Sequence, residues 1–154
     1  MTGASRPVVT LADAAPALDA AKTAFEQVAY PGRVDLVTRE LVRITSGRLS
    51  HCRLCRNLRL QAAVDRGFEE DMVAHLDDPD SSPLSQRHQA AVRFARQVLT
   101  DPSGITSDDA AALREHFGDE QLAELLLDLI RYRPGSRLTV VTGTDLADDE
   151  PVLI

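Results

Sequence analysis

Long apolar runs and aromatic side chains are scarce in this chain of 154 residues. It holds no Trp, two Tyr and four Phe, which argues against aromatic platforms on which bases or sugars stack. The longest apolar run, Ala123–Ile130, contains two acidic residues and is far shorter than the roughly 18 residues of a spanning helix. The first ten residues lack the apolar core of a secretory signal. We therefore expect a cytoplasmic protein with no membrane segment.

Several familiar functional motifs are also absent. The chain has no glycine-rich phosphate loop, no nucleophile elbow and no metalloprotease motif. The formal net charge of −7 gives no global attraction to nucleic acid or anionic membrane. The four histidines show no pairing that would complete a four-ligand zinc site. We therefore expect no nucleic-acid partner, no metal and no cofactor.

The charge that is present is unevenly distributed. Eight arginines but only three acidic residues lie between Pro31 and Arg66, and both cysteines of the chain, Cys52 and Cys55, lie in this basic segment. Two cysteines three positions apart in a reducing compartment indicate redox or metal chemistry more often than a structural staple. The arginines are compatible with a solvated face, an interface with the acidic surface of a neighbouring subunit, or a surface for an anionic substrate or acidic partner.

Apolar residues recur at helical spacing along most of the chain, which predicts an all-α, single-domain fold of about six to seven helices. Residues 13–144 are expected to form this domain and residues 1–12 a flexible N-terminus. Residues 145–154 are expected to be a tail that is mobile or lies on a partner subunit. The run Leu138–Thr142 is the only stretch with β-like composition.

Local signals divide the region around the cysteines into two helices. Asp35 is placed to cap the first helix, and the weak helix formers Thr45–Gly47 predict its end. A second helix is expected to begin near Ser50 and to run to Asp65. The two helices can then form a hairpin that carries the Cys-x-x-Cys motif.

The Cys-x-x-Cys motif brings two sulfurs together on one face of a first helical turn. Free backbone N–H groups at that helix end favour a thiolate. Arg56 and Arg59 follow the two cysteines by four positions, so a continuous helix would place both guanidinium groups on the same side as the sulfurs. A reactive dithiol needs this arrangement, because one sulfur attacks and the other resolves the product as a disulfide.

Glu40 is a candidate proton acceptor for this dithiol. It lies twelve residues before Cys52, which is about 18 Å on a straight helix, but a hairpin would bring it back toward the sulfurs. A plainer interpretation makes Glu40 a surface partner of Arg43 or Arg39. His51, on the turn beside Cys52, is either a solvated residue or a proton carrier.

A glutamate, a cysteine twelve residues later and a second cysteine three residues after that, on a helical background, resemble the alkylhydroperoxidase D / carboxymuconolactone decarboxylase superfamily. Three downstream segments are similar to that family as well: Pro83–Arg96, Ile105–Asp109 and Phe117–Leu125. The resemblance covers roughly residues 14–144, nearly the whole chain. It implies an all-α AhpD-like fold that assembles into homo-oligomers, as trimers or hexamers.

The resemblance also implies roles for individual residues. In the redox branch of the family the two cysteines reduce hydroperoxides while a glutamate and histidines pass protons. By position, Cys55 would be the attacking thiol, Cys52 the resolving thiol and Glu40 the relay glutamate. The family's Cys-x-x-Cys-x-x-x-His pattern has Arg59 at its last position here, and His51 is the nearest histidine that could replace it. An arginine can stabilise a thiolate but does not shuttle protons at neutral pH.

The sequence therefore predicts a thiol-dependent antioxidant oxidoreductase that reduces small-molecule hydroperoxides and is reset by a thiol or lipoyl-type reductant. The predicted site comprises five residues: Cys55, Cys52, Glu40, Arg59 and His51. Two other functions stay open at this point. One is a non-catalytic or redox-sensing member of the family, and the other is a decarboxylase- or hydrolase-like enzyme on the same scaffold.

Overall fold

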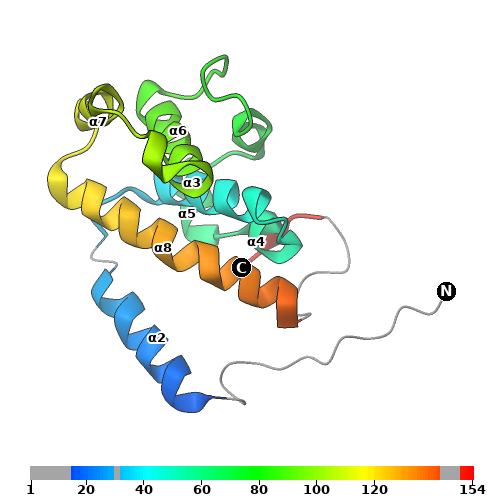
Figure 1. Cartoon of the computed structure of the whole chain (residues 1–154). Helices are drawn as coiled ribbons and strands as arrows, with labels where there is room; N and C mark the ends of the chain where they lie inside the picture. Colours follow the sequence, from blue (N-terminus) through cyan, green and yellow to red (C-terminus); the bar gives the residue numbers. More distant parts are fainter. Residues whose placement is uncertain (1–14, 30–31, 143–149) are drawn as a thin grey trace.

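Helices make up most of the structure, a computed structural model that describes residues 15–29, 32–142 and 150–154 (Figure 1). The elements, in chain order, are the helices α2 (Pro16–Ala29), α3 (Leu36–Leu49) and α4 (Arg53–Asn57), the strand β1 (Leu58–Arg59), the helix α5 (Gln61–Val64), the 3-10 helix η1 (Glu70–His75), the helix α6 (Gln86–Thr100), the 3-10 helix η2 (Pro102–Gly104), the helices α7 (Ser107–Arg114) and α8 (Asp119–Thr142), and the strand β2 (Val152–Leu153). The predicted all-α fold class is confirmed. The predicted flexible N-terminus, residues 1–12, lies outside the described residues.

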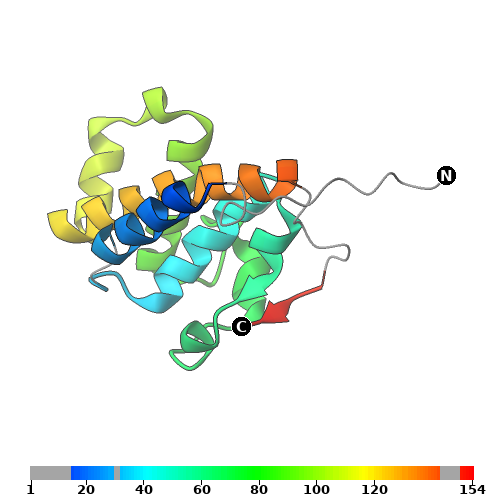
Figure 2. The ribbon, with the colours of Figure 1, turned by 90° about the horizontal axis from the view of Figure 1, so that it is seen from below.

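Helix α3 lies at the centre of the fold. It contacts α4, α6 and α8, and Figures 1 and 2 show α8 running along it with α2 on the outer side of α8. One apolar cluster joins α3 to α6, α7 and α8, with Val42, Phe117 and Leu129 among its buried members. A second cluster joins α3 to α5 and η1 through Leu41 and Ile44. Apolar contacts on both sides explain why most of α3 is buried.

The start of α3 is fixed by two carboxylates. Asp35 caps the helix as predicted, because its side chain accepts hydrogen bonds from the backbone N–H and the hydroxyl of Thr38, both at 2.8 Å. Glu124 of α8 accepts the backbone N–H of Arg33 at 2.9 Å. The bond from Arg33 to Glu124 holds the residues just before α3 against α8.

The predicted helix break at Thr45–Gly47 is wrong, since α3 continues to Leu49. Thr45 is buried and donates its hydroxyl to the carbonyl of Leu41 at 2.8 Å, a bond that is made inside a helix. Gly47 serves packing: a Cβ on it would lie 2.7 Å from the backbone N of Arg56 and 2.9 Å from the Cβ of Cys55. The missing side chain therefore lets α4 approach α3 closely.

The predicted single helix from Ser50 to Asp65 is also wrong. Helix α4 ends at Asn57, and the chain then extends through β1 before α5 begins. The backbone polar groups of this extended piece bind side chains of α3: the carbonyl of Leu58 accepts from Arg43, and the N–H of Leu60 donates to Glu40 at 3.0 Å. These side-chain partners take the place of helical hydrogen bonds.

The C-terminal residues also differ from expectation. Leu138–Thr142 continues α8 past Pro134 and forms no strand. The end of the chain, expected to be mobile or to lie on a partner subunit, pairs with its own β1 instead: Val152–Leu153 runs parallel to Leu58–Arg59. This pairing gives β1 a hydrogen-bonded neighbour that no local pattern in the sequence predicts.

Candidate functional site

The two cysteines form a disulfide where α4 begins. Cys52 is the N-cap of α4, and its sulfur accepts the backbone N–H of Cys55 at 3.1 Å. The Cα atoms of the two cysteines are 5.3 Å apart. Cys52 is fully buried whereas Cys55 is partly exposed. A small reagent from solvent can therefore reach Cys55 more readily than Cys52.

A tight turn connects α3 to the disulfide. The backbone N–H of Cys52 donates to the carbonyl of Gly47 at 3.0 Å, and His51 adopts a left-handed conformation with φ 53°. Histidine is one of the residue types that tolerate this region better than branched residues do. His51 is exposed, so the structure places it next to the disulfide but on the solvent side of the turn.

Glu40 is brought back toward the cysteines, as the hairpin predicted, but it is buried. Its carboxylate accepts two hydrogen bonds from Arg43, at 2.8 and 2.9 Å, and one from the N–H of Leu60. Arg43 also donates to the carbonyl of Cys55. The structure therefore connects Glu40 to the disulfide helix through a guanidinium. Pairing with Arg43 had been expected for an exposed glutamate, whereas the observed pair is inside the protein.

Arg59 points away from the side of α4 that the sequence predicted. Because α4 ends at Asn57, Arg59 lies on β1, and its guanidinium binds Glu70 of η1 with two hydrogen bonds of 2.7 Å. It also donates to the carbonyls of Arg56 and Leu58, and its side chain is only 6% exposed. The predicted placement of Arg59 on the sulfur side of a continuous helix is therefore wrong.

A cavity of about 450 Å³ adjoins the end of α4. It is lined by three arginines, one glutamate and four uncharged residues: Arg48, Arg56, Arg59, Glu70, Asn57, Val73, Ala74 and Pro151. Arg48 of α3 donates to the carbonyl of Val73 and to Asp77 at 2.6 Å each. The sequence showed that this segment is basic but did not indicate which arginines share a cavity. We call this cavity the arginine pocket.

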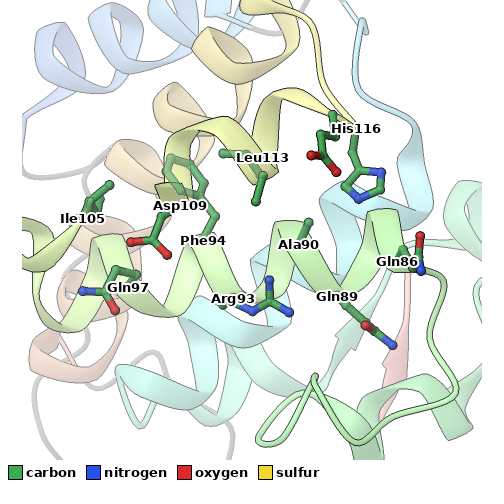
Figure 3. Close-up of a pocket in the computed structure, with 12 residues that line it drawn as sticks. Gln86, Gln89, Ala90, Arg93, Phe94, Gln97, Ile105, Asp109, Leu113 and His116 are labelled. Atoms are coloured by element: carbon green, nitrogen blue, oxygen red, sulfur yellow. The ribbon is translucent and has the colours of Figure 1, made fainter. Parts of the chain in front are cut away.

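Helices α6 and α7 enclose a second cavity of about 380 Å³ (Figure 3). Phe94, Ala90 and Leu113 supply apolar surface, and polar side chains including Arg93 and His116 lie around them. It contains no sulfur. A third cavity of about 240 Å³ is lined by Arg39, Arg43 and Ile154 among others. Within residues 15–29, 32–142 and 150–154, no group of three His, Cys, Asp or Glu side chains could hold a metal ion.

The described helices also contain no segment that is both long and apolar enough to cross a membrane.

Of the five predicted site residues, Cys52, Cys55 and His51 lie together at the turn before α4, and Glu40 reaches the same helix through Arg43. Arg59 lies on the other side, in the arginine pocket. Arg43 and Arg48 were missed as members of this region, although both belong to the basic segment.

The described chain thus has an all-α fold with a Cys-x-x-Cys disulfide at the start of α4. A protein from Agrobacterium tumefaciens has this fold in its crystal structure, with a TM-score of 0.76 and 18% identity over 96% of this chain and 99% of that one. It is described as a protein of unknown function and provisionally as an antioxidant defence protein AhpD. This similarity confirms the fold that the sequence resemblance implied.

Sequence relatives are uncharacterised proteins. Rv2313c of Mycobacterium tuberculosis strain H37Rv and MT2376 of strain CDC 1551 are each 33% identical over 119 residues, which is 77% of this chain and 42% of theirs. The chain therefore spans about two fifths of the length of these curated relatives. YdfG of Bacillus subtilis is 23% identical over 125 residues, 80% of this chain and 85% of its own. No protein-family model matches the chain.

Proposed function

We propose that this protein is a thiol-dependent antioxidant oxidoreductase that reduces small hydroperoxides through the Cys52–Cys55 pair. The observation that carries the proposal is the asymmetry of the disulfide: Cys55 is partly exposed, Cys52 is buried, and both lie at one helix start. A peroxide can reach the first sulfur, and the second is positioned to close the disulfide before further oxidation occurs. We place this chemistry in the cytoplasm, where thiol reductants are available.

The reaction cycle begins from the reduced pair. The thiolate of Cys55 attacks the terminal oxygen of the hydroperoxide, the O–O bond breaks, and the alkoxide takes a proton to leave as an alcohol. Cys55 is then a sulfenic acid. The thiol of Cys52 attacks it, the S–S bond forms and water is released. Two thiols of an external reductant, or one dithiol, then return both cysteines to the reduced state and become a disulfide.

Glu40 has a positioning role in this proposal. Both of its oxygens accept hydrogen bonds, and Arg43 carries the connection on to the carbonyl of Cys55. This connection positions the disulfide helix, and the proton of the attacking thiol passes to solvent. His51 is exposed beside the turn and is the nearest imidazole along the chain for exchange of that proton with solvent.

The test measures hydroperoxide consumption with a dithiol donor for the wild type, Cys55→Ser and Arg59→His. We expect turnover by the wild type, none by Cys55→Ser, and no gain for Arg59→His, because Arg59 is bound to Glu70 away from the sulfur side of α4. In parallel, mass spectrometry of the reduced protein after one equivalent of peroxide should show the loss of two hydrogens through a Cys52–Cys55 bond. Equal turnover by Cys55→Ser would refute the proposal.

A redox sensor is the second candidate function. The arrangement of Glu40 favours it, because the carboxylate is occupied by Arg43 and Leu60 while Arg59 is bound to Glu70. A sensor needs only the dithiol and a structure that responds to it. Oxidation by peroxide without turnover, accompanied by a change in assembly or partner binding, would favour this function.

We also propose that the chain assembles with copies of itself, as a trimer or a hexamer. Support comes from exposed apolar side chains on one long helix: Leu126, Ile130, Leu138 and Val141 of α8 are all exposed, as is Phe25 of the neighbouring α2. Apolar residues aligned on one helix face favour burial against another surface. Sedimentation velocity over a range of concentrations measures the assembly directly.

A further inference from the structure

We infer that Arg43 is a positioning residue for the dithiol: its guanidinium anchors the backbone of Cys55 and stabilises the thiolate that this cysteine forms when it is reduced. The sequence assigned this role to Arg56 and Arg59, which follow the cysteines by four positions. Arg43 instead lies on α3, outside the Cys-x-x-Cys motif. The inference rests on the proposed function, because it states what makes Cys55 the attacking thiol.

The hydrogen bonds of Arg43 connect its guanidinium to both Glu40 and Cys55. The atoms Nε and Nη2 donate to the two carboxylate oxygens of Glu40 at 2.9 and 2.8 Å, whereas Nη1 donates to the carbonyl of Cys55 at 2.5 Å. Because α4 ends at Asn57, a continuing helix does not supply a donor for the carbonyl of Cys55. Arg43 takes that place and fixes the residue that carries the exposed sulfur.

The sulfur of Cys55 lies close to this guanidinium, because the hydrogen bond is made to a backbone atom of the same residue. Within one cysteine, standard bond lengths keep the sulfur within about 5 Å of the carbonyl oxygen in every side-chain rotamer. With the 2.5 Å hydrogen bond added, the distance from Nη1 to the Cys55 sulfur is about 7.5 Å at most. This limit applies to the thiolate as well as to the disulfide. It is shorter than the roughly 8 Å over which salt screens charges at physiological ionic strength.

Burial makes the charge of Arg43 effective at the sulfur. The Arg43 side chain is 12% exposed and that of Glu40 is fully buried, so solvent screens the pair weakly. Glu40 offsets part of the positive charge, but hydrogen bonds connect it to Cys55 only through Arg43. The guanidinium is therefore the charge in contact with Cys55, and a positive charge beside a thiol favours the thiolate.

Other charged or titratable groups around α4 are the same in every variant that changes only Arg43 or Glu40. The main element packed against α4 is α3, whose other charged residues are Arg39, paired with Asp128, and Arg48, paired with Asp77. Those of α4, of the turn before it and of β1 are His51, Arg53, Arg56 and Arg59, the last of which is paired with Glu70. Differences between the variants therefore report on the Arg43–Glu40 pair.

The test measures the reactivity of Cys55 as a single thiol. Cys52→Ser leaves Cys55 as the only cysteine of the chain, and serine keeps an acceptor at the N-cap of α4. The probe is iodoacetamide, which is neutral. The thiolate displaces its iodide and forms a thioether, so the rate follows the thiolate fraction. Mass spectrometry of alkylation from about pH 5 to about pH 10 gives the midpoint of the pH profile.

The expected shifts have opposite signs for the two members of the pair. In the Cys52→Ser background, Arg43→Met should raise the midpoint and slow alkylation at neutral pH about threefold or more. Glu40→Gln should lower the midpoint, because it removes the negative charge and leaves the guanidinium in place. Arg43→Lys keeps the charge without the planar set of donors and should lie between Arg43→Met and the background. Arg93→Met is the matched control, because Arg93 of α6 is paired with Asp80, and its midpoint should not change.

The opposite signs separate an electrostatic role from a structural one. Arg43→Met and Glu40→Gln break the same ion pair, so a loss of local structure alone would move both midpoints in one direction. Movement in one direction, or an Arg43→Met midpoint equal to that of the background, would overturn the inference. If circular dichroism shows that Arg43→Met does not fold, Glu40→Gln decides alone, and an unchanged or raised midpoint overturns the inference.

The two proposals fail in different ways. Alkylation is measured without peroxide, so the expected shifts in a protein that consumes no hydroperoxide would leave the role of Arg43 standing and refute the proposed function. Hydroperoxide turnover that depends on Cys55, with no shift of the midpoint in either variant, would do the reverse.

Discussion

Replacement of Gly47 by alanine tests whether the disulfide helix depends on a close approach to α3. The added Cβ would lie 2.7 Å from both the backbone N of Arg56 and the carbonyl carbon of Cys55. These are backbone atoms, so α4 itself must move. Forced contacts of this kind cost about 1–3 kcal/mol, whereas alanine in place of glycine in a helix contributes about 1 kcal/mol of stability. We expect a net destabilisation of up to about 2 kcal/mol.

Gly135→Ala is the matched control, because Gly135 also lies within a helix but has nothing within 4 Å of its added Cβ. At Gly135 the added methyl group meets no steric contact, so only the higher helix propensity of alanine affects stability. This variant should be more stable than the wild type by up to about 1 kcal/mol. Urea unfolding of the oxidised proteins, followed by circular dichroism at one protein concentration, measures both. A Gly47→Ala variant as stable as Gly135→Ala would refute the close packing of α4 on α3.

Three further predictions concern other parts of the fold. Glu40→Gln leaves the guanidinium of Arg43, whose side chain is 12% exposed, without its counter-charge. It should lower the free energy of unfolding in urea by up to about 3 kcal/mol, while a second change, Arg43→Met, should recover part of that loss; no recovery would contradict the pairing. Burial lowers the pKa of His88 below its usual 6.5. The unfolded state therefore binds the proton more tightly, and stability should fall from about pH 7 to about pH 5, less so in His88→Gln. An identical pH profile for that variant would count against this assignment. Thr106→Ala removes the N-cap of α7, which forms a capping box with Asp109, and should lower the free energy of unfolding by about 1 kcal/mol. An unchanged midpoint of urea unfolding would show that the capping box contributes nothing to stability.

The sequence predicted the helices whose signals are local. Asp35 caps α3 as expected, because a cap needs only residues three positions apart. Helix α7 offers two adjacent candidates for its cap, Thr106 and Ser107, and the structure shows that Thr106 is the cap. Both residues can cap a helix, and only the reciprocal bond to Asp109 distinguishes them.

The site was predicted in part for the same reason. Cys52 and Cys55 are three positions apart, so their pairing at a helix start follows from the sequence spacing alone. The role of Glu40 depended on a hairpin, whose break was placed at Thr45–Gly47 and not at the turn that follows Leu49. The weak helix propensity of Gly47 predicts a break, whereas the residue lies inside α3 and is needed for tertiary packing against α4.

The sequence by itself determined the helical fold class, the pairing of the two cysteines and the concentration of positive charge around them, because these depend on composition and on spacings of a few residues. Only the tertiary structure decided which way Arg59 points and where the disulfide helix ends. Both depend on the side chains of Glu40 and Arg43 and on the strand Val152–Leu153, which meet the segment after Cys55 from distant positions in the chain. Hydrogen bonds made across such distances leave no periodic pattern in the sequence.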